Sequence, residues 1–421
     1  MVGTGRIAIV GAGPAGASLA LLLARCRVPV TLLEKETSLE RVFRGEGLMP
    51  AGMDALLQMH LGSLLQQIPS RQLQSWHIYL GGKAVFQIPE PVDRLGERAL
   101  SIVSQPALLE GILAEAETFP EFELRMGSQV KELRWQGDRV VGLTFEHQGQ
   151  TSELATDLVV GCDGRGSLVR RRAGLDIRLQ PDQYDVLWFK LPAPEQLRHT
   201  CQFYLMAKFQ QHPASCYTSW DGQLQYGLIL PKGGLSRLDG VDWLELAARP
   251  APDWLADHLL TQRHRVSEPV PLNVVVGHCQ QWSIPGVLLL GDAAHPMSPV
   301  RAQGINLALR DAIVAANYLV PALKQGTGIT DQTLQAIQNE RLPEVLRSQA
   351  LQRREASSLK LLRASPWKFS LAQRLLPIVG QIPIAQQAWL ARQRHLRFGS
   401  QPVQLQVAQP PSADSPQFLP Q

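Results

Sequence analysis

Three glycines, Gly11, Gly13 and Gly16, have the spacing of a loop that binds phosphate groups. The apolar run 7–10 before them is typical of a buried strand, and the uncharged run 17–24 after them is typical of a helix. In such a turn the first glycine permits the tight bend, the second lets a pyrophosphate approach, and the third lets helix pack on strand. Phosphate oxygens then accept hydrogen bonds from unpaired N–H groups at the positive helix end. The pattern predicts a dinucleotide-binding site.

An acidic residue, Glu34, supports this prediction from its position at the end of the next apolar strand, 29–33. It follows Gly16 by eighteen residues, close to the spacing at which such folds place a ribose-binding carboxylate. A carboxylate can accept hydrogen bonds from both ribose hydroxyls and would repel a 2′-phosphate, so we expect FAD or NAD rather than NADP. Ala15 in the turn and Lys35 beside the carboxylate are assigned to the same site.

A second segment, 157–164, ends a buried strand at Asp163 and Gly164. Ser167 follows as the expected cap of a short basic helix. Taken alone, this pattern is equally typical of an ordinary connection between a strand and a helix.

A third segment repeats the arrangement, because the apolar strand 286–290 is followed by a glycine and Asp292. A loop then enters a helix through Gly304, Ile305 and Asn306. Asp292 can hydrogen-bond a ribityl chain, and the helix start directs N–H groups at the electron-rich end of an isoalloxazine ring. The three separated segments therefore predict one shared cofactor site.

Together, these motifs resemble the single-component flavoprotein monooxygenases of the para-hydroxybenzoate hydroxylase fold, over about residues 5–350. The resemblance implies FAD as cofactor, with Asp163 and Gly164 near both FAD and NAD(P)H. It implies NAD(P)H as the transient electron donor and O₂ as co-substrate. An aromatic or lipophilic ring substrate would then be hydroxylated through a flavin hydroperoxide.

The resemblance also assigns roles to residues outside the three motifs. Arg44 matches an arginine that reaches the pyrophosphate, and Gln105 matches a helix-start residue near the ribityl or phosphate region. Pro299 lies where the family places a backbone carbonyl beside the flavin oxygen adduct, and His295 is the second catalytic candidate, as a loop-shaping residue close to the flavin. Arg301 stands where the family often has glycine, and either adds positive charge near the flavin or NAD(P)H or points into solvent.

Two other enzyme classes share these flavin motifs. A flavin-dependent halogenase needs a Trp-x-Trp-x-Ile signature, whereas segment 282–285 has one tryptophan only. A reductase or dehydrogenase of a prenyl-type substrate would use the flavin without inserting oxygen. The chain has no second glycine fingerprint, so NAD(P)H is expected to reach the flavin site from outside.

No residue stands out in the sequence as a base that would deprotonate a phenol. His77, His212, Tyr217 and Tyr226 lie in strand-rich regions, and we expect structural roles for them. The aromatic residues of 185–230 would suit a pocket for a flat or lipophilic substrate, although packing within a sheet is the expected role of any single one.

Composition narrows the function classes. A net charge of +4 on 421 residues gives no global field that would favour nucleic acid. The five cysteines are scattered without a CxxC pair, which indicates buried thiols rather than a disulfide framework or a metal site. The uncharged run 7–24 contains the fingerprint glycines and a proline, so we interpret it neither as a signal peptide nor as a membrane span and expect a cytoplasmic protein.

The order of strand and helix patterns predicts an α/β fold. We expect a Rossmann-like FAD-binding domain with an inserted mixed β-sheet substrate domain and a C-terminal helical region. Within the inserted part, the alternation over 75–88 predicts a hairpin that turns at Gly81 and Gly82. The expected divisions are FAD-binding parts 1–74, 105–176 and 281–330, substrate-domain parts 75–104 and 177–280, the helical region 331–399, and a disordered tail 400–421.

Near its C-terminus the chain is basic. Residues 356–413 contain no aspartate or glutamate, and their lysines and arginines alternate with apolar residues. Basic amphipathic helices of this kind can lie on an anionic membrane surface. The alternative is a helical layer packed on the FAD-binding domain, which the interrupting prolines favour.

Overall fold

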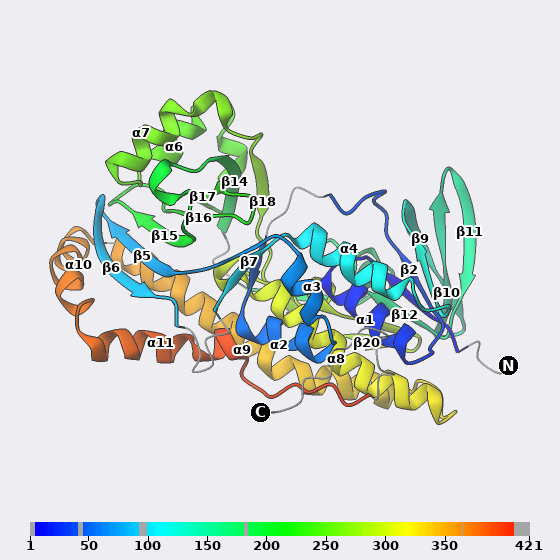
Figure 1. The fold of residues 1–421 in the computed structure, drawn as a ribbon. Coiled ribbons are helices and arrows are strands. Elements are labelled where there is room, and N and C mark those ends of the chain that lie inside the picture. Colours follow the sequence, from blue (N-terminus) through cyan, green and yellow to red (C-terminus); the bar gives the residue numbers. More distant parts are fainter. Residues whose placement is uncertain (1–4, 41–44, 92–98, 181–183, 364, 408–421) are drawn as a thin grey trace.

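A six-stranded, mostly parallel sheet forms the centre of the protein (Figure 1). The computed structural model describes residues 5–40, 45–91, 99–180, 184–363 and 365–407. In spatial order the strands are β20 (Ser283–Ile284), β21 (Val287–Leu289), β12 (Leu158–Gly161), β1 (Ile7–Val10), β2 (Val30–Leu33) and β8 (Phe122–Arg125). Only the β20–β21 pair among these is antiparallel. The predicted α/β fold is therefore confirmed.

The central sheet is covered on both faces. Ile7 and Ile9 of β1 pack against three helices, and Ala8 and Val10 pack against a three-stranded antiparallel sheet. The covering elements are α1 (Pro14–Arg25), α4 (Gln105–Ala116), α8 (Gln303–Lys324), β9 (Ser128–Gln136), β10 (Arg139–His147) and β11 (Gln150–Ala155). Successive strand residues point to opposite faces, so a sheet buried on both sides requires apolar runs such as 7–10.

A second sheet of seven strands forms the lobe on the left of Figure 1. Its order is β18 (Val270–Asn273), β14 (Tyr184–Pro192), β17 (Gln223–Pro231), β16 (Ala214–Thr218), β15 (Gln202–Ala207), β5 (Ser75–Leu80) and β6 (Lys83–Pro89). The expected hairpin is present, and its turn residues Gly81 and Gly82 both have positive φ. The sheet is mixed, because β5 pairs parallel with β15 while its other pairs are antiparallel.

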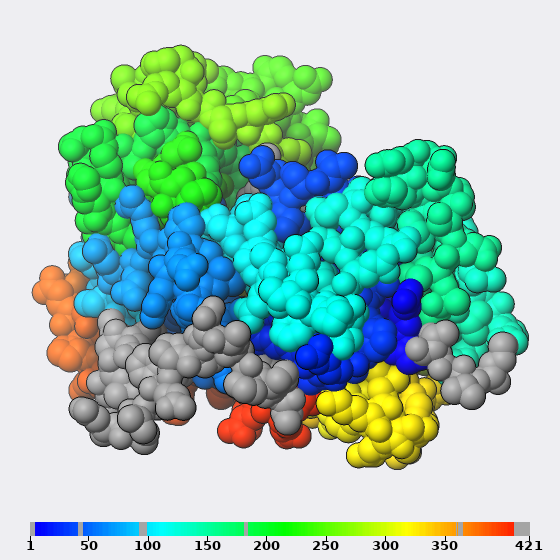
Figure 2. Space-filling view, turned by 45° about the vertical axis from the view of Figure 1, so that its right-hand side comes forward, coloured from blue at the N-terminus to red at the C-terminus, as the bar shows by residue number. Residues whose placement is uncertain are grey.

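One face of this second sheet is closed by helices α6 (Trp243–Ala248) and α7 (Asp253–Thr261). Leu187 and Phe189 of β14 pack toward them, while Val186 on the same strand lines a cavity on the opposite side. Figure 2 shows the surface hollowed between this green lobe and the blue-green lobe of β9–β11.

Long helices follow the last central strand. They are α9 (Asp331–Arg363), α10 (Pro366–Val379) and α11 (Pro383–Phe398). The remaining elements are α2 (Pro50–Gln58), α3 (Gly62–Gln67), α5 (Leu168–Arg172), β3 (Gly47–Leu48), β4 (Ser70–Gln72), β7 (Ser101–Val103), β13 (Ile177–Leu179) and β19 (Gly277–Cys279). Within the described ranges, every helix is too short or too polar to cross a bilayer. All five cysteines are buried and free.

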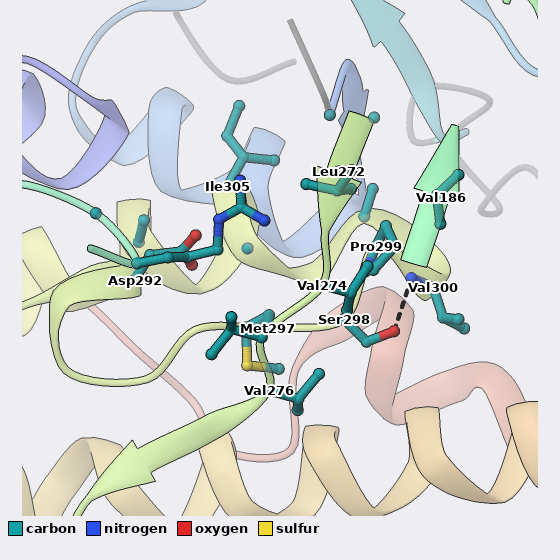
Figure 3. Close-up of a pocket in the computed structure, with 18 of the residues that line it drawn as sticks. Val186, Leu272, Val274, Val276, Asp292, Met297, Ser298, Pro299, Val300 and Ile305 are labelled. Atoms are coloured by element: carbon teal, nitrogen blue, oxygen red, sulfur yellow. Dashed lines mark hydrogen bonds between the residues drawn. The ribbon is translucent and has the colours of Figure 1, made fainter. Parts of the chain in front are cut away.

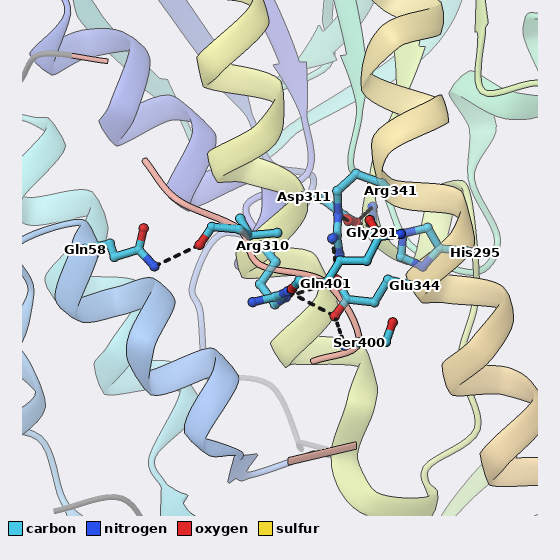
Figure 4. Close-up of polar contacts among 10 residues, drawn as sticks. Gln58, Gly291, His295, Arg310, Asp311, Arg341, Glu344, Ser400 and Gln401 are labelled. Carbon is cyan, nitrogen blue, oxygen red and sulfur yellow. Dashed lines mark hydrogen bonds and ion pairs between the residues drawn. The ribbon is translucent and has the colours of Figure 1, made fainter. Parts of the chain in front are cut away.

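The last described segment, 400–407, is packed, which corrects the expectation that the tail is disordered from Ser400. Val403 is buried in the core under α1, α4 and α8. Side chains of other elements bond to the backbone of this segment. Ser400 N–H pairs with Glu344 and Gln401 C=O with Arg310 (Figure 4), and Leu405 N–H donates to Gln58. These partners satisfy an extended backbone that composition alone suggested would stay solvated. Residues 408–421 lie outside the described residues.

Candidate active site

One cavity of about 1650 Å³ lies between the central sheet and the seven-stranded sheet. Pockets for a single small ligand measure about 300–1,000 Å³, so this cavity has room for a dinucleotide and a second molecule. The predicted site residues that line it are Gly11, Gly13, Ala15, Glu34, Lys35, Gln105, Asp163, Gly164, Asp292, Pro299, Gly304 and Ile305. Gly16, His295 and Asn306 are described but lie outside its lining, and Arg44 falls outside the described residues.

Each glycine of the turn after β1 has its own steric environment. Gly11 has φ +103°, and a Cβ there would lie 2.6 Å from the carbonyl oxygen of Cys162. A Cβ on Gly16 would lie 2.0 Å from the carbonyl oxygen of Gly11, whereas a Cβ on Gly13 would meet nothing within 4 Å. The first and third glycines are thus required by packing, and the second leaves open space above the first turn of α1, where no side chain caps the helix.

Glu34 joins the end of β2 to this turn. Its side chain is buried, and its two oxygens accept hydrogen bonds from the backbone N–H groups of Ala12 (2.9 Å) and Glu36 (3.0 Å). Lys35 lies at the exposed edge of the cavity, and its Nζ is 3.4 Å from Glu36 Oε1. A carboxylate is therefore held beside the phosphate-binding turn, as the sequence predicts for a ribose partner.

Asp163 has a structural function in addition to its place in the cavity wall. Its carboxylate accepts hydrogen bonds from Ser167 Oγ (2.5 Å) and from the backbone N–H groups of Leu168 (2.6 Å) and Val169 (3.1 Å), which caps α5. Gly164 has φ +78°, so this position favours glycine.

The other end of the cavity contains the start of α8. Gly304 and Ile305 lie in its first turn, which contains no acidic residue and has no side-chain cap. A Cβ on Gly304 would lie 3.6 Å from Asp292 Oδ1, so that carboxylate stands directly at the helix start. Burial raises the pKa of Asp292, and nearby Arg165 and His295 partly oppose the shift. Figure 3 shows Asp292 and Ile305 at one side of the pocket.

Asn306 positions a neighbouring segment through its side-chain amide, and its assignment to the cofactor stays a prediction. Its Oδ1 accepts a hydrogen bond from Met49 N–H (2.8 Å), and its Nδ2 donates to the carbonyl oxygens of Gly47 (3.2 Å) and Ala302 (2.6 Å). A Cβ on Gly52 would lie 2.0 Å from Asn306 Oδ1. Both polar atoms of the side-chain amide are therefore hydrogen-bonded within the protein. These bonds join α8 to the segment of chain before α2.

The sequence predicts His295 as a loop-shaping residue close to the flavin, and in the structure its side chain lies outside the cavity lining. Its side chain is 1% exposed and packs on the indole of Trp282, with ring centroids 5.0 Å apart. Its Nε2 lies 2.7 Å from Asp311 Oδ2 (Figure 4). The ring is therefore directed into the interior between α8 and α9, and it shapes the loop as a positioning residue.

Asp311 is the centre of a buried charge network. It also accepts hydrogen bonds from the backbone N–H of Gly291 (3.1 Å) and from Arg341 Nε (2.8 Å). Arg341 and Arg310 both pair with Glu344. Burial alone would raise the pKa of Asp311, but His295 and Arg341 hold it at about 2. The network links the turn after β21 to both α8 and α9.

The loop that contains Pro299 is held by two buried glutamines that the sequence patterns did not reveal. Gln352 Nε2 donates to the carbonyl oxygens of Ser298 (2.9 Å) and Val300 (2.5 Å). Gln349 Nε2 donates to the carbonyl oxygens of Gly277 (2.6 Å) on β19 and of Pro296 (3.4 Å) in the loop. The only feature of the sequence that could have indicated them is that they are uncharged polar residues within a long helix. Figure 3 shows Ser298, Pro299 and Val300 facing the side of the pocket formed by Val186 and Leu272.

Arg301 lines the cavity beside Pro299 and its side chain is 12% exposed, so it does not point into solvent. Its φ of +59° is unusual for a residue with a side chain. The guanidinium carbon lies 3.9 Å from the ring centroid of Trp76 and 4.8 Å from that of Trp389, and Nε donates to Glu355 (3.1 Å). Two cation–π contacts and an ion pair offset the backbone strain. Arg301 therefore attaches α9 and α11 to the loop beside Pro299.

The aromatic residues of the second sheet divide by strand face. Trp188, Phe203 and Tyr217 line the cavity, whereas Tyr226 packs against Phe189 and donates its hydroxyl to Ala247 C=O (2.7 Å). The two histidines that the sequence analysis considered, His77 and His212, also line the cavity. His77 stacks on Tyr204 and lies 2.8 Å from Ser75 Oγ, and burial lowers the His77 pKa.

These features fit FAD. The open space above Gly13 suits a pyrophosphate, Glu34 suits the adenosine ribose, and Asp292 with the uncapped start of α8 suits the flavin end. All of them face one continuous cavity.

Comparison with known proteins agrees with this arrangement. A family model described as an FAD binding domain matches residues 5–351. A 6-methylpretetramide 4-monooxygenase from Streptomyces rimosus is 31% identical over 354 residues, which cover 82% of each chain. A 3-hydroxybenzoate 6-hydroxylase from Klebsiella oxytoca is 27% identical over 377 residues, covering 81% of this chain and 85% of the hydroxylase.

A solved structure shows the same fold. The p-nitrophenol 4-monooxygenase of Pseudomonas putida DLL-E4 superposes with a TM-score of 0.77, at 18% sequence identity. The match covers 94% of this chain and 98% of that enzyme.

The two exchanges Gly13→Ala and Gly16→Ala should separate cofactor approach from folding. Gly13→Ala is expected to change the unfolding free energy of the FAD-free protein by no more than about 1 kcal/mol, while weakening FAD binding at least tenfold or so because a methyl group fills the open space. Gly16→Ala should cost about 1–3 kcal/mol, since its Cβ meets backbone. Denaturant unfolding and FAD fluorescence titration measure the two effects. Equal stability of both variants would contradict the assignment.

Asp311→Asn should destabilise the protein by about 3–5 kcal/mol at neutral pH, because it leaves charged partners buried. An unfolded aspartate has a pKa of about 3.9, above the folded value of about 2. Ionised Asp311 therefore contributes about 2–3 kcal/mol above pH 4 or so, and this contribution is lost as the pH falls through the folded pKa. Denaturant unfolding between about pH 5 and pH 1 should show a smaller decrease in the free energy of unfolding for Asp311→Asn than for the exposed control Asp138→Asn. Identical acid profiles would refute this.

Proposed function

This chain belongs to the FAD-binding-domain family, and on that premise we propose that it hydroxylates a phenolic ring held against the apolar wall of its cavity. The protein is an FAD-dependent monooxygenase that uses NAD(P)H as electron donor. The observation that carries the proposal is that one cavity joins the dinucleotide cradle to a wall of apolar and aromatic side chains.

The protein's own residues bind, orient and shield the reactants. When bound, FAD supplies the redox chemistry, which is electron acceptance from NAD(P)H and activation of O₂. The glycine turn and Glu34 anchor one end of the cofactor, and Asp292 with the start of α8 holds the other. The loop around Pro299 faces Val186 and Leu272 across the pocket, and these apolar side chains exclude water from the reacting ring.

The wall indicates a flat, lipophilic substrate. Trp188, Phe203 and Tyr217 present aromatic surface, and Val274 and Met297 add aliphatic surface. Aromatic side chains prefer offset or edge contacts with other rings, which orients a planar substrate as well as desolvating it.

The halogenase and reductase alternatives are not favoured. Trp282 is the one tryptophan in the segment that we compared with the halogenase signature. It is fully buried against His295 and does not line the cavity. Relatives that match this chain over about four-fifths of its length include a 6-methylpretetramide 4-monooxygenase and a 3-hydroxybenzoate 6-hydroxylase.

A lipid surface is the partner that we propose for the C-terminal helices. Large apolar side chains are exposed on α10 and at the start of α11, and they include Trp367, Leu371, Leu375, Ile378, Ile382 and Ile384. No acidic residue occurs in 356–413, so the lysines and arginines of α10 and α11 give these helices positive charge. This combination suits the interface of an anionic membrane. Trp389 of α11 also lines the cavity, so substrate from a lipid phase would enter beside these helices.

Anaerobic mixing with NADH or NADPH, followed by O₂ and a panel of phenols, tests the catalytic proposal. We expect loss of the oxidised-flavin absorbance, and incorporation of one atom of ¹⁸O₂ into a ring product. Gly13→Ala, assayed in parallel with equal protein, should give neither signal at limiting FAD. Flavin reduction without labelled product from any phenol would refute ring hydroxylation and favour a reductase.

Sedimentation with vesicles tests the lipid surface. Wild-type protein should bind vesicles with anionic lipid more than neutral vesicles, and the triple variant Trp367→Ala, Ile378→Ser, Ile384→Ser should bind about tenfold more weakly. The control exchanges Trp135→Ala and Leu179→Ser remove exposed apolar side chains elsewhere and should bind normally. Equal binding of all variants would contradict the proposal.

A further inference from the structure

Arg301 presents an unused hydrogen-bonding edge at the cavity. It is a largely buried lining residue, and its Nε donates to Glu355 (3.1 Å). Among the residues that the structure describes, none accepts a hydrogen bond from its two terminal nitrogens, and neither nitrogen is sealed from solvent. A guanidinium whose Nε is occupied can still bind a planar oxyanion end-on, through one N–H of each terminal nitrogen.

Two indoles hold this edge in one orientation. The contacts of the guanidinium with Trp76 and Trp389, described above, place the planar group against both rings. Both indoles also line the cavity. Because the plane of the guanidinium is held before a ligand arrives, little side-chain entropy is lost when a carboxylate binds to it.

Two further cations lie on the same wall of the cavity. The residues of α9 that line it recur at the spacing of one helical face, and they include Gln349, Gln352, Arg353, Ala356 and Lys360. Arg353 and Lys360 are separated by about two helical turns, or about 10 Å along the helix axis. Glu355 is the one acidic residue of α9 in the lining, and it is paired with Arg301. This wall is therefore positive and attracts anions.

Glu46 is a second buried carboxylate in the lining, and it has a cation of its own. Its side chain is 4% exposed, Lys190 Nζ lies 3.2 Å from Oε1, and Ser219 Oγ donates to Oε2 (2.6 Å). Burial raises the pKa of Glu46, and Lys190 opposes the shift. The negative charge of Glu46 is thus offset in part by Lys190, and the α9 wall keeps its positive charge.

A row of aromatic side chains beside Arg301 indicates what the anion is attached to. The ring centroids of Trp76 and Phe203 are 4.9 Å apart, and those of Phe203 and Tyr217 are 6.3 Å apart. All three residues line the cavity. A flat ring that lies along this row can direct a carboxylate substituent at the guanidinium while its own faces meet apolar surface. The phosphates of a dinucleotide are assigned instead to the open space above Gly13.

We propose that Arg301 binds a carboxylate group of the aromatic substrate, and is therefore a specificity-determining residue. Arg353 and Lys360 draw the anion toward this position. Because Arg301 belongs to the loop that contains Pro299, a ring anchored by it is oriented relative to the reacting end of the cofactor. The inference rests on the proposed ring hydroxylation and names a carboxylated aromatic compound as its substrate class.

Titration of the oxidised holoenzyme with 3-hydroxy-2-naphthoate and with its uncharged amide, without NAD(P)H, tests this inference. The change in flavin absorbance reports binding. Wild-type protein should bind the acid about 10- to 100-fold more tightly than the amide. Arg301→Gln should abolish this preference and keep the affinity for the amide within about twofold, whereas Arg301→Lys should retain only part of it because an ammonium lacks the planar fork. The surface control Arg134→Gln should keep the full preference.

The rate of association supplies a second readout. The double variant Arg353→Gln, Lys360→Gln should bind the acid about tenfold more slowly than wild type, with a weaker dependence of the rate on salt. Its rate of association with the amide should be unchanged, because an uncharged probe is not steered by the cations. Stopped-flow mixing that follows the flavin absorbance measures both rates.

Each contrary result has its own meaning. If Arg301→Gln weakens the acid and the amide equally, its role is only structural and the inference is wrong. Slower flavin reduction by NAD(P)H in Arg301→Gln, with no substrate present, would assign the anion to the nicotinamide cofactor and also overturn the inference. If wild type hydroxylates phenols and binds acid and amide equally, the inference falls and the proposed function stands. If it hydroxylates no phenol and binds neither probe, both fall.

Discussion

The carboxylate of Asp311 fixes the geometry on which the rest of the site depends. It lies in α8, yet its partners belong to the turn after β21 and to α9, so one buried group joins three elements. Removing a partner from such a network would leave an uncompensated charge in the interior, which confines these elements to one arrangement. The start of α8, Asp292 and the loop around Pro299 are therefore held relative to the central sheet.

The cavity between the two sheets owes its character to strand alternation. Along β14, Leu187 and Phe189 face α6 and α7, while Val186 and Trp188 face the cavity. The wall opposite the dinucleotide cradle is consequently apolar, with few ionisable groups. In such surroundings a group like Glu46 is electrostatically influential, because a low local dielectric strengthens each interaction that it makes.

The C-terminal helices contribute to the site as well as to the surface. Arg301 lies between Trp76 and Trp389, so contacts from β5 and α11 meet at a strained residue of the flavin loop. Gln349 and Gln352, both on α9, donate hydrogen bonds to Pro296 and Ser298 of the same loop. Exposed apolar side chains on α10 lie on the same helical layer. The same helical layer therefore contacts the pocket and contains the exposed apolar side chains.

The sequence alone determined the features that depend on local spacing. The turn at Gly11 and Gly16 and the strand that ends at Glu34 follow from steric rules within a few residues, so the α/β fold and FAD could be predicted. Only the tertiary structure decided which side chains meet across long separations. It turned His295 and Asn306 away from the cavity, packed segment 400–407, and brought Glu46 to Lys190 and Ser219. Such contacts carry no local signature, because their geometry exists only after distant strands and helices have packed together.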